Sequence, residues 1–313
     1  MRGGIHMTYL IQTNRLTKVY GGKEVVSDVS MHVKKGEIYG FLGSNGAGKT
    51  TIMKLITNLI KPTSGHIEIF GETLTNKSYE VLRRMGTIIE YPIFHEHLTA
   101  KEILNLHCEY MGYYDKKEID QVLDLVNLSH TEGKSVEDFS LGMKQRLGIA
   151  RAIITKPELL ILDEPINGLD PSGIKEIRDL LKMLCKEYGI TILISSHILG
   201  EMEKIADTIG VIHNGRLIRE LSMDEVNLKQ LNYIEMIVDD GKKAAFILEN
   251  ELAIVNFKLV EDHCIRIYES SITQNTISKA LIEQNVEIKE ISMKKNSLED
   301  YFLKLINGGE ISA

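Results

Sequence analysis

A run of eight residues, Gly43–Thr50, constrains the fold of this 313-residue chain more than any other feature. Its sequence, Gly-Ser-Asn-Gly-Ala-Gly-Lys-Thr, has the spacing G-x-x-x-x-G-K-[ST] of a phosphate-binding loop. Residues 37–42 before it predict a strand, and residues 51–56 after it predict the start of a helix. A glycine-rich turn with an accidental Lys-Thr is the alternative, but it does not explain the strand and the helix on either side.

The residue types in this loop suit a nucleoside triphosphate. Glycines let successive backbone N–H groups turn inward, and the following helix directs its positive N-terminus at the same point. We expect Lys49 to reach the β- and γ-phosphates and the Thr50 hydroxyl to hold Mg²⁺. Tyr20 is expected to stack on the nucleotide base, although an ordinary hairpin residue is the other interpretation. The expected nucleotide-binding residues, which the resemblance described below assigns to ATP, are Tyr20, Gly43, Ser44, Asn45, Gly46, Ala47, Gly48, Lys49, Thr50 and Thr51.

Two adjacent acidic residues follow a second apolar run. Residues 159–162 are continuously apolar, as a parallel strand buried on both faces requires, and they end in Asp163 and Glu164. The carboxyl ends of such strands are where α/β sheets place their ligands. We therefore expect Asp163 to hold Mg²⁺ and Glu164 to act as the base on water. A solvated acidic turn is the alternative, and it would leave the phosphate-binding loop without a metal-binding acid.

A third apolar strand, residues 190–194, ends in Ser195, Ser196 and His197. A lone histidine is more often structural than functional. At the tip of a strand beside the phosphate site, however, His197 is expected to contact the γ-phosphate. The residues Lys49, Glu164 and His197 are therefore the catalytic candidates.

In the rest of the first two thirds of the chain, hydrophobic periodicity predicts further strands and helices. Residues 10–19 and 25–33 predict two antiparallel strands, and residues 52–60 predict the helix that follows the loop. Residues 99–128 have apolar side chains at helical spacing and no strand signal, which predicts a helical insertion. Ser140 is well placed as the N-cap of a further helix.

Beyond residue 221 the pattern changes to strand, helix, strand, strand, helix, strand and a closing helix. These elements are expected over residues 233–238, 242–250, 257–260, 264–268, 272–284, 286–292 and 297–306. The order is typical of a small ferredoxin-like domain. The region carries no catalytic constellation, so packing or dimer support is favoured over ligand sensing.

Composition narrows the class of protein. The net charge of −7, without a block of basic residues, argues against nucleic acid or lipid headgroups as the main partner. Cys108, Cys185 and Cys264 are odd in number and lack metal-ligand spacing, which indicates reduced thiols in a cytoplasmic protein. No apolar run approaches the roughly 18 to 20 residues that span a bilayer, and no signal peptide opens the chain. Residues 1–6 fit no element and resemble a cloning remnant, so we expect the natural start at Met7.

Over about residues 10–220 these motifs resemble the ATP-binding subunits of ATP-binding cassette (ABC) transporters. The match consists of a Walker A loop at 43–50, a Walker B segment at 159–164, a D-loop at 167–171, the switch histidine His197 and the base-stacking Tyr20.

The resemblance implies an α/β fold of the P-loop NTPase class and of the ABC ATPase type. Such a fold has an antiparallel β subdomain and a helical subdomain, here at about residues 92–155. The ATP-binding domain would span residues 7–220, and residues 221–313 would form a small α+β, ferredoxin-like accessory domain.

In this family two ATPase subunits face each other head to tail, and each ATP lies between the Walker A loop of one subunit and the signature motif of the other. The signature position is occupied here by Ser140, Leu141, Gly142 and Met143, and the D-loop acid is Asp170. The residues agree with such a shared site, because the helix that starts at Ser140 can direct its dipole at an anion but has no phosphate-binding loop near it in the sequence. The resemblance also implies that residues 92–99 contact the coupling helices of transmembrane permease subunits.

At two positions this sequence departs from the usual ABC motifs, and both departures indicate a narrower group within the family. The usual signature L-S-G-G-Q is replaced by Phe139-Ser140-Leu141-Gly142-Met143, and the loop glutamine that touches Mg²⁺ and the attacking water is replaced by Glu90. With the carboxy-terminal residues 297–303, these changes resemble the ATPases of bacterial bacitracin-resistance and lantibiotic-immunity exporters.

That resemblance implies an ATPase that uses ATP and Mg²⁺, dimerises with ATP and works with a permease at the inner face of the cell membrane. Glu90 then joins the catalytic candidates and, with Thr50 and Asp163, the metal-binding ones. The nearer alternative to an antibiotic exporter's ATPase is the ATPase of an exporter or importer of another substrate. A soluble cassette ATPase acting on ribosomes or DNA is more distant, because the second cassette or long coiled-coil insertion of those proteins is missing.

Overall fold

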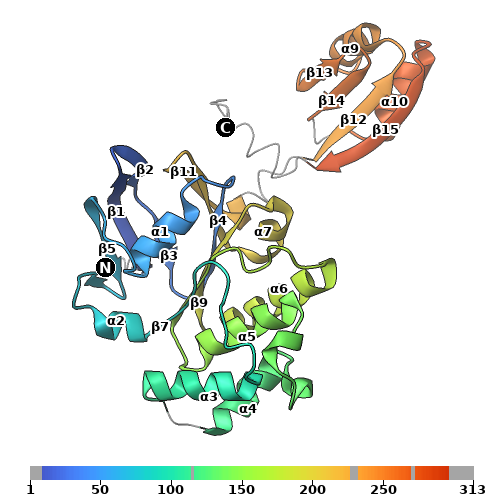
Figure 1. Cartoon of the computed structure of the whole chain (residues 1–313). Helices are drawn as coiled ribbons and strands as arrows, with labels where there is room; N and C mark the ends of the chain where they lie inside the picture. Colours follow the sequence, from blue (N-terminus) through green and yellow to red (C-terminus); the bar gives the residue numbers. More distant parts are fainter. Residues whose placement is uncertain (1–8, 114–115, 226–231, 269–271, 296–313) are drawn as a thin grey trace, which may run out of the picture. The chain divides into compact units, whose positions relative to one another are not determined.

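The computed structural model describes residues 9–113, 116–225, 232–268 and 272–295. Its internal contacts divide the chain into two compact units, Met1–Met223 and Asp224–Ala313. Each unit is described separately (Figure 1).

A six-stranded sheet forms the centre of the first unit. Its strand order is β11-β10-β4-β9-β8-β7, and only β11 runs antiparallel to its neighbour. The strands are β4 (Ile38–Leu42), β7 (Met85–Ile88), β8 (Leu159–Leu162), β9 (Thr191–Ser196), β10 (Thr208–His213) and β11 (Arg216–Ser222). Every residue of β4, β8 and β9 is buried, which explains why their sequences are nearly continuous apolar runs.

A second, antiparallel sheet surrounds the long strand β1 (Tyr9–Tyr20). Its other strands are β2 (Lys23–Val29), β3 (His32–Lys34), β5 (Ser64–Ile69) and β6 (Glu72–Thr73). The sequence predicted one strand over residues 25–33, but β2 ends at Val29 and β3 begins at His32. At the break, the Thr13 hydroxyl donates to the Val29 carbonyl at 2.9 Å and accepts from the Met31 N–H at 3.0 Å. These two bonds replace the ladder hydrogen bonds that the break removes.

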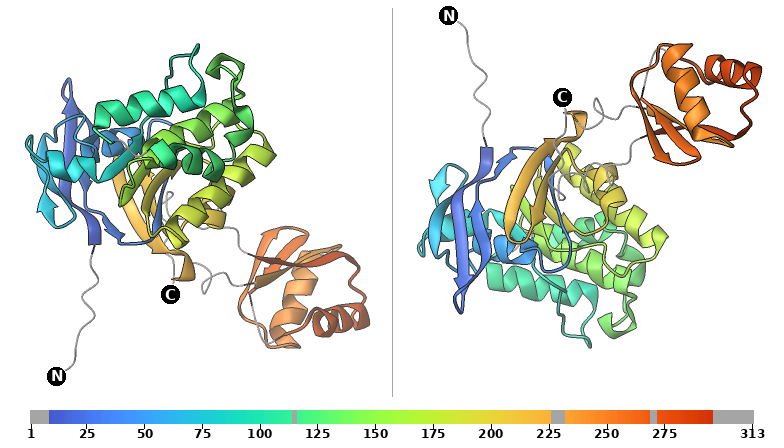
Figure 2. Two further views of the ribbon diagram at one scale, coloured as in Figure 1. Left: turned by 90° about the horizontal axis from the view of Figure 1, so that it is seen from below. Right: turned by 90° about the horizontal axis from the view of Figure 1, so that it is seen from above.

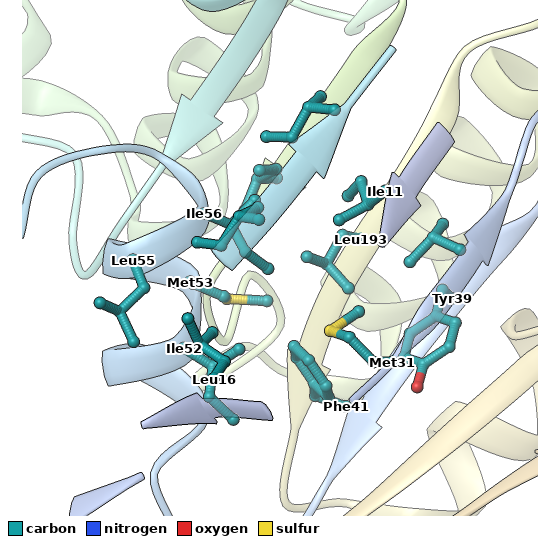
Figure 3. Close-up of a cluster of buried hydrophobic side chains, with 14 of the residues drawn as sticks. Ile11, Leu16, Met31, Tyr39, Phe41, Ile52, Met53, Leu55, Ile56 and Leu193 are labelled. Atoms are coloured by element: carbon teal, nitrogen blue, oxygen red, sulfur yellow. The ribbon is translucent and has the colours of Figure 1, made fainter. Parts of the chain in front are cut away.

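Helix α1 (Lys49–Ile56) packs between the two sheets and fills the main core of the first unit. Figure 3 shows Ile52, Met53 and Ile56 of α1 among side chains from both sheets, including Leu16 and Phe41. The helix is shorter than the predicted 52–60 at its carboxyl end. The Thr57 hydroxyl donates to the Met53 carbonyl at 2.8 Å, and the next residue has a positive φ of 61°. This local bonding ends the helix early.

Three helices cover the opposite face of the six-stranded sheet. They are α5 (Leu141–Ile153), α6 (Pro171–Lys186) and α7 (Leu199–Ile205). A Cβ added to Gly40 in β4 would lie 2.8 Å from the Met202 sulfur of α7, and one added to Gly86 in β7 would collide with the Ala152 carbonyl of α5. These glycines therefore let the helices approach the sheet closely. In both views of Figure 2 the blue antiparallel strands and the green helices flank the six-stranded sheet on opposite sides.

The predicted helical insertion contains α3 (Ala100–Met111) and α4 (Lys116–Leu125). Thr99 and Glu102 form a capping box at the start of α3, and Gly112 ends the helix in the left-handed conformation. A short helix α2 (Tyr79–Arg83) precedes β7, and short 3₁₀ turns at Ser129–Thr131 and Val136–Asp138 lead to α5. No helix within the described residues is long and apolar enough to cross a membrane.

Over residues 232–268 and 272–295, the second unit contains one four-stranded sheet and two helices. Its elements are β12 (Asn232–Val238), α9 (Gly241–Asn250), β13 (Phe257–Glu261), β14 (Cys264–Ile267), α10 (Gln274–Glu283) and β15 (Ile288–Lys295). The sheet order is β13-β14-β12-β15, and every neighbouring pair is antiparallel. The chain order is the strand, helix, strand, strand, helix, strand pattern expected from the sequence. The closing helix predicted at 297–306 lies outside the described residues.

Candidate active site

The phosphate-binding loop connects β4 to α1, as the sequence predicts. Gly46 and Gly48 have positive φ angles of 80° and 108°, which favour glycine. A Cβ on Gly48 would lie 2.9 Å from the Val25 carbonyl, and one on Gly43 would collide with the Ile212 carbonyl. The loop is therefore enclosed by β2 and by the end of β10, and its backbone path requires small residues. Ser44, Asn45, Ala47 and Thr51 lie in this loop or at the start of α1.

Lys49 lies beneath this loop and is 5% exposed. Its ammonium group donates to the Gly43 carbonyl at 2.7 Å and to the Ser44 carbonyl at 3.3 Å. A Glu164 carboxylate oxygen lies 3.2 Å from the same nitrogen. The ammonium group that is expected to bind phosphate is therefore paired with the carboxylate that is expected to act as base.

Asp163 and Thr50 meet at the carboxyl edge of the sheet. The Thr50 hydroxyl donates to one Asp163 oxygen at 2.7 Å, and the Ser195 hydroxyl donates to the other at 2.6 Å. Asp163 is 5% exposed, so its carboxylate is held in one orientation by these two bonds. A hydroxyl and a carboxylate oxygen side by side are hard donors of the kind that Mg²⁺ prefers. The described residues contain no cluster of three or more His, Cys, Asp or Glu side chains that could hold a metal. Mg²⁺ typically takes only one or two carboxylates and completes its shell with phosphate and water, so this pair fits the ion.

Ser195 is a site residue that was not singled out from the sequence. Besides its bond to Asp163, its oxygen accepts from the Glu164 N–H at 2.8 Å. Ser195 therefore orients both acidic residues that follow β8. The available signal was its position at the end of β9, two residues before His197.

Glu164 lies between two cationic or proton-carrying groups. One carboxylate oxygen faces Lys49, and the other lies 2.9 Å from His197 Nδ1. Glu164 also has a positive φ of 50°, which is uncommon for a residue with a side chain. Strained backbone of this kind recurs at active sites. The structure thus brings together Lys49, Glu164 and His197, the three catalytic candidates that the residue pattern alone indicated.

Glu90 follows β7 and also has a positive φ, at 67°. Its carboxylate lies 2.6 Å from the Lys54 ammonium group, and the two side chains are 64% and 33% exposed. Lys54 is one helical turn beyond Thr50 on α1, so Glu90 faces the same side of that helix as the Thr50 hydroxyl. The next residue, Tyr91, accepts from the Asn167 side-chain amide at 3.4 Å.

Tyr20 ends β1 at the hairpin to β2 and is 48% exposed. The Lys18 ammonium group lies 4.9 Å from the centre of its ring. Strand β2 continues from this hairpin to Val25, whose carbonyl adjoins Gly48 and Gly215. The exposed ring is therefore connected to the phosphate-binding loop through β2.

The signature residues form a separate group at the start of α5. Ser140 caps this helix by accepting from the Met143 N–H at 3.3 Å, as predicted. The D-loop lies against it: a Cβ on Gly142 would sit 3.8 Å from a Leu169 methyl group, and Asp170 caps α6 by accepting from the Gly173 N–H at 3.1 Å. Among the described residues, no hydrogen bond or ion pair joins positions 140–143 to the phosphate-binding loop. One chain thus carries two separate sets of the expected ATP-contacting residues.

Comparison with known proteins places this arrangement in a family. The family described as ABC transporter matches residues 26–167. The uncharacterized ABC transporter ATP-binding protein YcbN of Bacillus subtilis is 64% identical over 98% of this chain and 100% of its own length. The chain belongs to the family of ABC transporter ATP-binding proteins.

Two further relatives have a named transport role. The bacitracin transport ATP-binding protein BcrA of Bacillus licheniformis is 48% identical over 97% of this chain and 100% of that protein. The lantibiotic transport ATP-binding protein SrtF of Streptococcus pyogenes is 43% identical over 71% of this chain and 95% of that protein. These relatives confirm the resemblance to bacitracin and lantibiotic ATPases that the sequence indicated.

A solved structure supports both the fold and the binding of a nucleotide. A dimeric ATP-binding cassette bound to ADP and phosphate superposes with a TM-score of 0.62 and 25% identity, covering 68% of this chain and 98% of that one. The α/β fold expected for the first unit is therefore confirmed. As an ABC ATPase, the domain binds ATP and hydrolyses it.

Proposed function

We propose that this chain is the ATPase subunit of a membrane exporter that removes peptide antibiotics of the bacitracin or lantibiotic type. The observation that carries the proposal is the similarity to BcrA, because it extends over 97% of this chain and so includes the second unit. SrtF, named for lantibiotic transport, supports the same class of substrate.

In this proposal the phosphate-binding loop receives the triphosphate of ATP, and Tyr20 stacks on the base. The Lys49 ammonium group leaves its ion pair with Glu164 and contacts the β- and γ-phosphates instead. Thr50 and Asp163 would hold Mg²⁺, and Glu90, in the loop after β7, would also contact the ion. When bound, the ion would neutralise phosphate charge and help to align the γ-phosphate for attack.

Glu164 acts on the attacking water. One of its carboxylate oxygens accepts the proton as the water oxygen bonds to the γ-phosphorus and the bond to the ADP oxygen breaks. His197 orients this carboxylate, from which its Nδ1 is 2.9 Å distant, and contacts the γ-phosphate. The products are ADP and phosphate.

A second copy of the chain would complete each site. The signature residues Ser140, Leu141, Gly142 and Met143 form the start of α5 and would offer its positive end to the ATP of the other copy. The N–H groups of Leu141 and Gly142 lack a partner within the helix, whereas that of Met143 donates to the Ser140 hydroxyl. Asp170 would keep the D-loop in position at the same interface. We further infer that residues 7–220 form the ATP-binding domain and that residues 221–313 support the dimer.

The membrane contact would be made by the loop at residues 92–99, on the inner face of the cell membrane, against the transmembrane permease subunits. To test the function, the chain is produced together with a candidate permease in a bacterium sensitive to bacitracin and to a lantibiotic. The minimal inhibitory concentration should rise several-fold with the wild type and not with Lys49→Ala. Unchanged sensitivity in cells that contain an ATP-hydrolysing complex would refute antibiotic export and favour another transported substrate.

A further inference from the structure

The hairpin between β10 and β11 contacts the phosphate-binding loop, although it lies far from that loop in the sequence. Its turn consists of Asn214 and Gly215, and His213 of β10 pairs with Arg216 of β11 across it. Both turn residues have a positive φ, at 48° and 76°. A two-residue hairpin of this form is a type I′ turn, which an Asn-Gly sequence adopts readily. The sequence of the turn therefore fixes its backbone geometry.

Gly215 lies between the phosphate-binding loop and β2 and is bonded to both. Its N–H donates to the Ala47 carbonyl at 2.9 Å, and its own carbonyl accepts from the Ser27 N–H of β2 at 2.8 Å. A Cβ on Gly215 would lie 2.6 Å from the Val25 carbonyl oxygen, so only glycine fits against β2 at this position. The two bonds and the close approach together hold the turn in place against the loop.

The bond to Ala47 sets the orientation of one peptide group in the loop. A trans peptide group directs its N–H opposite to its C=O. Because the Ala47 carbonyl points at the hairpin, the N–H of Gly48 in the same peptide group points away from it. That N–H has no acceptor among the described residues, and Gly48 is the N-cap of α1, where free N–H groups attract anions. The hairpin thus orients a donor that is available to phosphate.

This peptide group needs support from outside the loop. Its rotation changes the ψ of Ala47 and the φ of Gly48, and a glycine accepts a φ of either sign. A rotated group would present a carbonyl oxygen to phosphate in place of an N–H, which replaces an attraction by a repulsion. The same glycine that gives the loop its path therefore makes this group easy to turn, and the bond from Gly215 holds it in one orientation.

We propose that Gly215 is a positioning residue for ATP, because its N–H holds the Ala47 carbonyl outward and so directs the Gly48 N–H at the phosphates. The hairpin is then a part of the phosphate site, although it lies outside the motifs at 43–50, 159–164 and 167–171. The inference rests on the assignment of the triphosphate to residues 43–50, and it adds the segment that keeps this loop in its binding conformation.

The variant Gly215→Ala tests the proposal, and the chain offers a matched control. The turn between β5 and β6 has the same form, with a φ of 55° at Phe70 and 78° at Gly71, but a Cβ on Gly71 would meet nothing within 4 Å. Alanine at either position is strained by the positive φ. Only Gly215→Ala also pushes the turn away from β2 and from the phosphate-binding loop. Comparing the two variants separates loss of the bond to Ala47 from backbone strain.

ATP affinity and turnover are measured on the purified full chain. Gly215→Ala should raise the Kd for ATP, and for inorganic pyrophosphate in displacement of a fluorescent ATP analogue, by about tenfold or more, because a hydrogen bond to a charged group is lost. Its kcat at saturating ATP should stay within about threefold of wild type, since Glu164 is untouched. Gly71→Ala should keep the Kd within about twofold of wild type.

Substitutions of Asn214 provide a second test that adds no atom against β2. Asn214→Gly keeps a residue that accepts a positive φ, so its ATP affinity should equal that of the wild type. Asn214→Val introduces a β-branched side chain, which strongly disfavours this conformation and distorts the turn. It should weaken binding of ATP and of pyrophosphate in the same way as Gly215→Ala, again with little change in kcat.

The remaining outcomes overturn either the inference or its basis. Equal ATP affinities for folded Gly215→Ala and Gly71→Ala, or a loss of kcat without a change in Kd, would refute the positioning role. If Gly215→Ala does not fold, equal affinities for Asn214→Val and Asn214→Gly refute it instead. Lys49→Ala is the reference for the site and should lose ATP binding. Normal ATP binding by Lys49→Ala would refute the assignment of the triphosphate to this loop itself.

Discussion

Replacing Glu164 by glutamine should separate nucleotide binding from hydrolysis. The amide cannot accept a proton from water, and a general base contributes about 10²- to 10⁴-fold to a rate. We therefore expect the turnover of Glu164→Gln to fall by about 100-fold or more. The fold should be unaffected, because glutamine has nearly the same shape and can still hydrogen-bond to His197.

The structure also predicts the effect on affinity. Glu164 lies 3.2 Å from the Lys49 ammonium group, and the two side chains are 20% and 6% exposed. At an effective dielectric constant of about 20, that separation corresponds to a gross attraction of about 5 kcal/mol. Desolvation offsets most of it, so the net coupling is of the order of 1 kcal/mol. Since phosphate must take Lys49 from this carboxylate, Glu164→Gln should bind ATP as tightly as the wild type or up to about tenfold tighter.

Two assays on the purified chain measure these effects. Steady-state phosphate release gives turnover, and equilibrium titration with a fluorescent ATP analogue gives affinity. The matched control is Lys49→Ala, which should lose both binding and turnover. Turnover within a few-fold of wild type would remove Glu164 from the role of base. ATP binding weakened more than tenfold in Glu164→Gln would refute the competition between phosphate and carboxylate for Lys49.

Four further outcomes are expected. Gly142→Asp should abolish hydrolysis because its carboxylate repels the γ-phosphate of the other copy, and mixing it with Lys49→Ala should restore about one composite site per dimer in an ATPase assay; no recovery despite ATP-dependent dimers would contradict the shared site. Removal of residues 224–313 should leave ATP affinity within a few-fold of wild type while weakening dimerisation in sedimentation experiments; a folded truncate that cannot bind ATP would count against this. Ser195→Ala should lower turnover by about tenfold and raise the Mg²⁺ concentration needed for half-maximal activity, because Asp163 and the Glu164 N–H each lose a bond; an unchanged Mg²⁺ dependence would show that Ser195 is structural only. Glu90→Gln should bind ATP within about tenfold of wild type and still hydrolyse it, whereas Glu90→Ala should lose stimulation by the reconstituted permease; full stimulation of the alanine variant would leave Glu90 without a coupling role.

The arrangement of the phosphate site was predictable because it depends on local sequence. The loop spacing fixes Lys49 and Thr50 relative to each other, and apolar runs fix the strands that end at Asp163 and His197. Parallel strands in one sheet bring their carboxyl ends to one edge, so their last residues meet without further information. The order of strands and helices in the second unit was also predictable, because hydrophobic periodicity is a local property of the sequence.

The bonds within the site were not predictable from local patterns. Ser195 reaches Asp163 only because β9 pairs with β8 in the observed register, with Leu162 opposite Ile194. That register depends on packing between segments far apart in the sequence. The break between β2 and β3 has a similar origin, since it depends on a hydroxyl of Thr13 in another strand.

The exchange of the usual loop glutamine for Glu90 is compensated within the chain. An added carboxylate near the phosphates would be repelled by them, but Lys54 lies 2.6 Å from Glu90 and supplies an opposite charge. Lys54 and Thr50 lie one turn apart on α1, so this helix is hydrogen-bonded to Asp163 through Thr50 and to the loop after β7 through Lys54. Three residues further along the same loop, the Ile93 carbonyl accepts from Arg151. The loop after β7 is therefore held to α1 at Glu90 and to α5 at Ile93, and a change at the phosphates can reach it through a single turn of α1.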